Sequence, residues 1–187
     1  MTVDRAITPL DDIMQRYSLG DITAFNALYD ALAPRLYRFC LRLTRRRSEA
    51  DDLFQDALLR LHRARASYTP GAPPLPWIYA IARSAYLDRL RWRRRRPEST
   101  EVPDERISAV DEMSPESESH ARTLHGVVER ALAGLSEKNR SAYILLREED
   151  LGVAEAAAIL GITGDAVKQR AHRACEQIKA ALRAAEW

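Results

Sequence analysis

The sequence predicts an all-α protein in which two small helical domains are joined by a flexible acidic linker. Apolar residues recur at spacings of three and four on both sides of a central strip, and both sides are rich in Ala, Leu and Arg. The strip, residues 97–119, contains three prolines and five serines and shows little apolar periodicity. Since 187 residues can form two small domains, we expect these at 10–96 and 120–187.

The net charge of +2 conceals a strong asymmetry along the chain. Residues 1–96 carry 18 basic against 10 acidic residues, a net charge of +8. Residues 97–119 carry one Arg against eight acidic residues, a net charge of −7. Residues 120–187 carry ten basic against nine acidic residues, a net charge of +1. A basic first domain indicates a polyanionic partner.

Three helices are expected in the first domain. The first is interrupted or kinked at Pro34, and Ser48 is a plausible N-cap of the second. Four prolines and a glycine make residues 67–76 a loop, and the third helix begins near Trp77 and continues into the arginine run at 91–96. The expected inward faces are Phe25, Leu28, Tyr29, Leu32, Leu36, Phe39, Cys40 and Leu43 in the first helix and Ala50, Leu53, Phe54, Ala57 and Leu61 in the second.

The end of the second domain has the pattern of a helix-turn-helix. Two helical patterns, 153–160 and 164–183, are separated by a short turn, residues 161–163. Gly161 suits the position after a helix end, and Thr163 suits an N-cap. Upstream, Ser136 can cap a helix that runs through Leu145 and Leu146. The helix before it is expected to have an inward face of Leu124, Val127, Val128, Ala131, Leu132 and Leu135.

The last helix separates an apolar face from a polar one. Its inward face is expected to be Val167, Ala171, Ala174, Cys175, Ile178 and Leu182. Its outward face combines groups suited to base edges and phosphates with two acids, namely Asp165, Lys168, Gln169, His172, Arg173 and Glu176. A recognition helix is one interpretation, and a solvated amphipathic helix is the other.

The third helix of the first domain combines aromatic residues with a high density of arginine. Ile78, Ala82 and Ala85, with Trp77 and Ile81 beside them, are expected to face the core. A second stripe consists of Tyr79, Arg83, Tyr86 and Leu90. Aromatic rings that stack on bases, next to guanidinium groups that hold phosphates, are typical of single-strand binding. The alternative is a tyrosine packed between helices and a solvated basic tail.

The second helix has an acidic outer face next to one exposed leucine. Asp52, Gln55, Asp56 and Leu59 follow at i, i+3, i+4 and i+7, and Asp51 adds a further carboxylate. Acidic residues near a helix N-terminus also complement its dipole, which offers a structural explanation for Asp51 and Asp52. The remaining residues favour a surface for a basic protein partner.

Nothing in the sequence points to an enzyme, a cofactor or a metal. It contains no phosphate-binding glycine motif and no Ser/His/Asp arrangement, and its four histidines are scattered. Cys40 and Cys175 are expected to be reduced core residues, as in a cytoplasmic protein. We find no signal peptide, and no run reaches the ~18 apolar residues of a membrane helix.

Three segments together resemble the extracytoplasmic-function (ECF) sigma factors of bacteria. They are EADDLFQDALLRLHR (49–63), PWIYAIARSAYLDRLRWRRRR (76–96), and the stretch from ALAGLSEKNRSAYILL (131–146) through AAAILGITGDAVKQRAHRACEQI (156–178). The resemblance implies a sigma-2 domain at 10–96, a linker at 97–119 and a sigma-4 domain at 120–187. It also implies three partners: RNA polymerase core through its β′ and β subunits, promoter DNA and an anti-sigma factor.

The resemblance assigns residues to three surfaces. The core polymerase surface consists of Asp51, Asp52, Gln55, Asp56 and Leu59. The surface for melting and capturing the −10 element consists of Trp77, Tyr79, Arg83, Ser84, Tyr86, Arg89, Arg91 and Arg93. The surface for the −35 duplex consists of Thr163, Asp165, Ala166, Lys168, Gln169, Arg170, His172 and Arg173. The acidic linker resembles the connector that runs through polymerase towards the RNA exit path.

The chain departs from the family pattern at three positions. Many relatives have Asn at position 84, where this chain has Ser, and they often have Thr and Leu at positions 166 and 171, where it has Ala. Two other functions remain open, a stand-alone helix-turn-helix regulator and a protein-interaction module.

Overall fold

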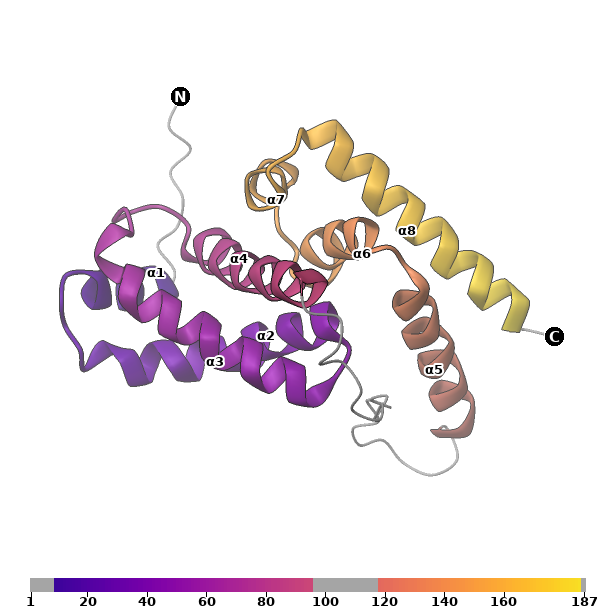
Figure 1. The fold of residues 1–187 in the computed structure, drawn as a ribbon, viewed down its shortest axis with the longest axis horizontal. Helices are drawn as coiled ribbons and strands as arrows, with labels where there is room; N and C mark the ends of the chain where they lie inside the picture. The colour runs from indigo at the N-terminus through magenta and orange to yellow at the C-terminus, as the bar shows by residue number, and fades with distance from the viewer. Residues whose placement is uncertain (1–8, 96–117, 186–187) are drawn as a thin grey trace. The chain divides into compact units, whose positions relative to one another are not determined.

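The computed structural model describes residues 9–95 and 118–185, which are mostly helical and contain no strand (Figure 1). The chain divides into two compact units. The described part of the first comprises residues 9–41 and 48–95, and that of the second comprises residues 118–185 with the short segment 42–47. The predicted all-α class with two helical domains is confirmed. The predicted linker, residues 97–119, lies outside the described residues except for its last two positions, which begin a helix.

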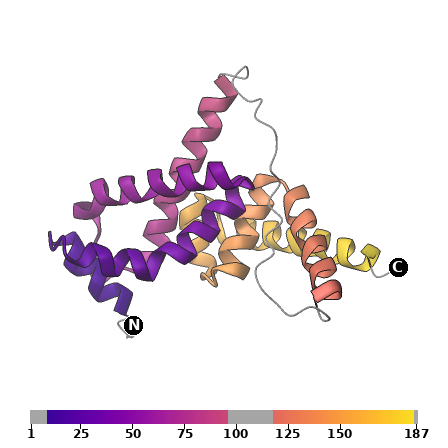
Figure 2. The same ribbon diagram turned by 90° about the horizontal axis from the view of Figure 1, so that it is seen from below.

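The first unit is built from four α-helices and one short 3-10 turn within the described residues. They are α1 (Pro9–Ser18), α2 (Ala24–Thr44), α3 (Arg47–Ala64), the turn η1 (Arg65–Ser67) and α4 (Pro74–Arg95). Helix α2 contacts both of its long neighbours through aromatic rings, because Tyr37 meets Phe54 of α3 and Phe39 meets Tyr79 of α4. In Figure 2 the C-terminal end of α4 extends beyond α2 and α3.

Helix α1 is absent from the sequence-based expectation, although it contributes to the core. Met14 and Tyr17 are fully buried, and the Tyr17 ring lies 5.6 Å from that of Phe25 on α2. The Tyr17 hydroxyl also lies 2.6 Å from Nδ1 of His62 on α3. This hydrogen bond gives the buried phenol a polar partner, so α1 is held to both α2 and α3.

Two expected helix starts in the first unit are wrong, and the helix expected to be interrupted or kinked at Pro34 is not interrupted there. Helix α2 continues through Pro34 to Thr44, because one proline removes a single hydrogen bond and this one lies on the exposed side. Helix α3 begins at Arg47, so Ser48 lies inside it rather than capping it. Helix α4 begins at Pro74 and not near Trp77, since proline fits the first turn of a helix, where its missing N–H is not needed.

The second unit packs its longest helix against three others. Its elements are α5 (Glu118–Gly134), α6 (Glu137–Tyr143), the π-helical turn η3 (Ile144–Glu148), α7 (Val153–Leu160) and α8 (Gly164–Ala185). Helix α8 contacts α5, α6 and α7. Leu132 of α5 and Leu135, just after α5, pack against Ala174 and Ile178 of α8 in a buried cluster. This cluster joins α5 to α8. Ser136 caps α6, because its hydroxyl accepts a hydrogen bond from the Asn139 N–H at 3.4 Å.

The helix-turn-helix pattern is reproduced in backbone detail. Gly161 ends α7 with φ of 65°, a left-handed conformation that glycine adopts without steric cost. The Thr163 hydroxyl then accepts a hydrogen bond from the Ala166 N–H at 3.2 Å and caps α8. Two other expectations are wrong, since Tyr29 and Leu124, both placed on inward faces, are 40% and 38% exposed.

Candidate functional site

The outer face of α3 presents the expected acidic surface. Asp51, Asp52 and Gln55 are exposed, and the Leu59 side chain beside them is 47% exposed. Asp56 is half-buried. The Tyr37 hydroxyl of α2 donates a hydrogen bond of 2.7 Å to the Asp51 carboxylate, which fixes one edge of this surface. A positively charged partner can approach the other carboxylates from solvent.

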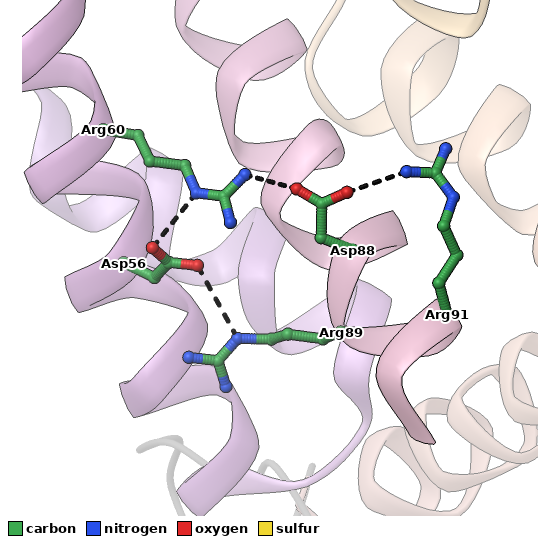
Figure 3. A network of polar contacts seen from close by, with 5 residues as sticks. All are labelled: Asp56, Arg60, Asp88, Arg89 and Arg91. Carbon is green, nitrogen blue, oxygen red and sulfur yellow. Dashed lines mark hydrogen bonds and ion pairs between the residues drawn. The ribbon is translucent and has the colours of Figure 1, made fainter. Parts of the chain in front are cut away.

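Arginines from α3 and α4 link these acids into an ion-pair network (Figure 3). Arg60 lies between two carboxylates, with Nε 3.1 Å from Asp56 and Nη1 2.6 Å from Asp88 of α4. The other oxygen of Asp88 accepts a hydrogen bond of 2.7 Å from Arg91. The hydrogen bond from Arg60 is the largest cause that lowers the pKa of Asp88 from its usual 3.8. Asp88 is therefore an anion whose charge is compensated from two sides.

Two further arginines of α4 are directed at α3. Arg89 donates a hydrogen bond of 2.8 Å to the backbone carbonyl of Asp52, and its guanidinium lies 3.6 Å from the Asp52 carboxylate and 3.9 Å from that of Asp56. Arg93 makes an ion pair of 2.8 Å with Glu49. Arg60, Arg89 and Arg93 therefore join α3 to α4, whereas Arg91 pairs with Asp88 within α4.

The aromatic stripe of α4 lies in the core of the first unit. The Tyr79 side chain is 0% exposed, and its ring centroid lies 4.7 Å from that of Phe39. Tyr86 is also buried. The packing alternative raised by the sequence thus describes Tyr79, because a fully buried ring offers no face to a base. Trp77 is half-buried and meets the Tyr68 ring edge-on at 5.3 Å.

The exposed groups of α4 are concentrated on its last turns. Ser84 and Arg91 are exposed, while Arg83, Arg89 and Arg93 are half-buried. The Trp92 side chain, which the sequence analysis did not single out, is 51% exposed. The available signal was a single tryptophan inside the arginine run, where a buried ring is not expected.

Helix α8 presents the expected polar face to solvent. Its inward residues Val167, Ala171, Ala174 and Ile178 are buried. The residues assigned to the −35 surface are exposed at Thr163, Asp165, Lys168, Gln169, His172 and Arg173 and half-buried at Ala166 and Arg170. Lys168 lies 3.6 Å from the Asp165 carboxylate, an ion pair between exposed side chains that is weak in water. The face can therefore exchange this pair for a phosphate.

Within residues 9–95 and 118–185, no group of three His, Cys, Asp or Glu side chains is arranged to hold a metal ion. The two cysteines are free thiols, with Cys40 buried and Cys175 half-buried. Burial raises the pKa of the Cys40 thiol to about 12, so it is protonated and unreactive at neutral pH. None of the described helices is long and apolar enough to cross a bilayer.

Two protein-family models match the chain in the order that the two units follow. The model of sigma-70 region 2 matches residues 28–96, and the model of sigma-70 region 4 matches residues 125–178. The first match covers α3, α4 and most of α2, and the second covers α7, the turn after it and most of α8. The pairing of the two models disfavours a stand-alone helix-turn-helix regulator.

Curated relatives match over most of their length. The RNA polymerase sigma factor CarQ of Myxococcus xanthus is 32% identical over 174 residues, which cover 90% of this chain and 95% of that protein. The ECF RNA polymerase sigma factor SigM of Mycobacterium tuberculosis is 32% identical over 165 residues, covering 87% of this chain and 79% of that protein.

Two solved structures have a similar fold. The sigma factor RpoE of Bartonella quintana, solved in complex with the anti-sigma factor NepR, gives a TM-score of 0.72 at 22% identity, over 87% of this chain and 98% of that one. CnrH, solved with the cytosolic domain of CnrY, gives a TM-score of 0.68 at 22% identity, over 93% of this chain and 97% of that one.

Proposed function

Because the chain belongs to the extracytoplasmic-function (ECF) group of RNA polymerase sigma factors, we propose that three of its surfaces bind polymerase core and the two promoter elements. As a sigma factor it is a transcription initiation factor and not an enzyme. It directs polymerase to its promoters through binding energy alone. The observation that carries this assignment is the pair of separate units, one with an acidic helix face and one with a helix-turn-helix.

The acidic face of α3 is the proposed contact with core polymerase. Asp51, Asp52, Gln55 and Leu59 are exposed there, and Asp56 lies between Arg60 and Arg89 in the ion-pair network. A basic element of the β′ subunit is the expected partner, because carboxylates around one apolar side chain match cations on an amphipathic surface. This partner must compete with Arg89 for Asp52 and Asp56.

The exposed side of α4 is the proposed contact with the −10 element. Ser84 and Arg91 are exposed, and Arg83, Arg89 and Arg93 remain partly accessible. The side chains of Tyr79 and Tyr86 are buried, so they hold α4 in the core of the first unit rather than stack on bases. Half-buried Trp77, next to the loop before α4, can contact a displaced strand only through the accessible part of its ring.

Helix α8 is the proposed reader of the −35 duplex. An α-helix fits the major groove, where Gln169, Lys168 and Arg173 can reach base edges and phosphates. The Thr163 hydroxyl already accepts from the Ala166 N–H, so its remaining role is to donate to a phosphate. Ala166 and Ala171 offer no hydrogen bond, so we expect base readout to come from the longer side chains.

Two further properties are carried over from relatives. One solved neighbour was determined with the anti-sigma factor NepR and the other with the cytosolic domain of CnrY, and we propose that an anti-sigma factor controls this chain too. We place the protein in the bacterial cytoplasm, where polymerase core and promoter DNA are found. The acidic linker, residues 97–119, is proposed to run through polymerase in place of nucleic acid.

Co-elution with core polymerase in size-exclusion chromatography tests the proposal. The full chain should elute with core, and a variant carrying Asp52→Arg and Asp56→Arg should elute separately. Lys179→Glu, on the exposed side of α8 outside the proposed surfaces, serves as the matched charge-reversal control and should still elute with core. Failure of the unchanged chain to co-elute would contradict its function as a sigma factor.

A further inference from the structure

Two tyrosines of α2 enclose one phenylalanine of α3. Tyr29 and Tyr37 lie eight positions apart on α2, and both meet the ring of Phe54 edge-on. The ring centroids lie 6.2 Å from Phe54 for Tyr29 and 5.7 Å for Tyr37, at interplanar angles of 64° and 85°. Edge-on pairs are favourable because the positive edge of one ring meets the negative face of the other. The two contacts therefore fix how the N-terminal half of α3 is turned towards α2.

This rotation of α3 places the Asp51 carboxylate next to Tyr37. Asp51 precedes Phe54 by three positions, so the two side chains are neighbours on α3. The Tyr37 hydroxyl donates a hydrogen bond of 2.7 Å to Oδ1 of Asp51, the usual length for a hydroxyl donor. Because the Tyr37 side chain is half-buried and its ring is packed against Phe54, its hydroxyl is a donor in a fixed position.

The carboxylates of the acidic face are held by two kinds of donor. Asp52 and Asp56 lie beside the guanidinium of Arg89, at 3.6 and 3.9 Å, whereas Asp51 is held by the neutral hydroxyl of Tyr37. A basic partner must displace Arg89, because two cations compete for the same charge. It does not have to displace Tyr37, because a hydroxyl brings no charge and a carboxylate can accept several hydrogen bonds. Asp51 is therefore oriented and still available to a cation.

We propose that Tyr37 is a positioning residue of the core polymerase contact, holding the exposed Asp51 carboxylate in the orientation that the basic partner binds. This inference rests on the proposed function of the acidic face of α3. Ordering a surface side chain on binding costs conformational entropy, and a hydrogen bond present in the free protein removes part of that cost. Tyr37 adds no charge to the contact and acts through Asp51.

A double-mutant cycle on the affinity of the full chain for purified core polymerase tests the proposal. Tyr37→Phe keeps the ring and removes the hydroxyl. It should weaken core binding about two- to fivefold, the lower part of the range for ordering one side chain. In a chain that carries Asp51→Ala there is no carboxylate to position, so the same substitution should have no effect on affinity. An equal loss in both backgrounds, no loss in either, or an Asp51→Ala chain that binds core normally would overturn the proposal.

Tyr29→Phe is the matched control, because its ring also meets Phe54 from α2. It should bind core like the unchanged chain, and a loss as large as that of Tyr37→Phe would show that the loss does not depend on Asp51. Urea unfolding of the same variants measures stability separately. A merely structural role of the Tyr37 hydroxyl predicts a lower unfolding free energy with unchanged core affinity of the folded chain, and that result would also contradict the proposal.

The salt dependence of core affinity separates positioning from charge. Asp51→Ala removes a charge from the contact and should flatten this dependence. Tyr37→Phe leaves the charge in place, so its salt dependence should equal that of the unchanged chain, and a flatter one would count against the proposal. The proposed core contact itself fails if the unchanged chain does not bind core or if Asp52→Arg with Asp56→Arg binds equally well. The positioning role alone fails if core binding and its loss in that variant hold but the cycle shows no coupling.

Discussion

Helices α4 and α8 are both 22 residues long and basic, yet they use their charges differently. On α8 the apolar residues are buried, and Lys168, Gln169, His172 and Arg173 point to solvent. On α4 the aromatic residues Tyr79 and Tyr86 are buried. Arg89 and Arg93 of α4 make ion pairs with acids of α3.

The difference shows that the number of charges on a helix does not measure the charge it offers to a partner. Helix α8 has fewer cations, but its outward face has no neighbouring helix to pair with in the described part of its unit. Helix α4 lies beside the acidic helix α3, so several of its arginines hold the helix pair together. We therefore expect substitutions in α4 to affect stability and DNA binding together, and substitutions on the outer face of α8 to affect DNA binding alone.

The largest expected effect is that of Tyr79→Ala on the stability of the first unit. Removing a fully buried aromatic ring from a core costs about 3–5 kcal/mol of unfolding free energy. Tyr79→Phe keeps the ring next to Phe39 and should cost much less. Urea unfolding of both variants measures the difference. An unfolding free energy of Tyr79→Ala within 1 kcal/mol of the unchanged chain, together with lost strand capture, would assign Tyr79 to DNA instead.

A second large effect is expected at the acidic surface of α3. Replacing Asp52 and Asp56 by Arg removes two carboxylates from the proposed contact, so core binding should weaken by at least about tenfold. The new arginines also lie beside Arg89 and Arg60, and this repulsion should lower the melting temperature. Gln55→Arg adds a charge on the same face outside the ion pairs and should weaken core binding with little loss of stability. Core affinity unaffected by both variants would remove this face from the polymerase contact.

A smaller effect is expected for the exposed cations of α8. Lys168→Ala and Arg173→Ala should each weaken binding to the −35 duplex and lower its salt slope by about 0.9 where a phosphate contact is lost. Because both side chains are exposed, the unfolding free energy should change by no more than about 0.5 kcal/mol. Duplex affinity is measured at several salt concentrations, with Lys179→Ala as the matched control on the same helix. Equal slopes for all four proteins would exclude phosphate contacts at Lys168 and Arg173.

The smallest expected effect is the pH dependence contributed by Asp88. Its pKa is lowered below 3.8 in the folded chain, chiefly by the hydrogen bond from Arg60. The stabilisation is therefore present above pH 3.8 and is lost as the pH falls through the lowered pKa of the folded state. Since the pair is partly exposed, the contribution is under about 1 kcal/mol. Asp88→Asn should reduce the loss of unfolding free energy as the pH falls below 3.8. An unchanged pH dependence would show that the ion pairs of Asp88 do not stabilise the fold.

Periodicity predicted the faces of α8 but not the partners of α4. The exposed and buried residues of α8 follow from one apolar stripe, and Gly161 and Thr163 mark its start in the sequence. The ion pairs of α4 depend on which helix lies beside it, and the sequence contains no local signal for that. Near Tyr79, both stripes of α4, the one with Ile78 and the one with Tyr79, consist of apolar or aromatic residues. The pattern alone therefore could not show which stripe faces solvent.

Two features of the first unit were not expected from the sequence. Helix α1 has ten residues and was not expected, although Met14 and Tyr17, which are three positions apart and pack in the core, were a signal for it. Trp92 was overlooked because the arginines around it dominate the segment. Its exposure depends on where α4 leaves the bundle, which is a property of the packed unit.

The most direct measurement of the central claim is run-off transcription on genomic fragments with purified core polymerase. Core with the full chain should produce discrete transcripts that core alone does not, and the Asp52→Arg, Asp56→Arg variant should abolish them. The combination of Lys168→Ala and Arg173→Ala should reduce the same transcripts without changing their start sites. Absence of any transcript that depends on the chain, although core is active with another sigma factor, would contradict the claim.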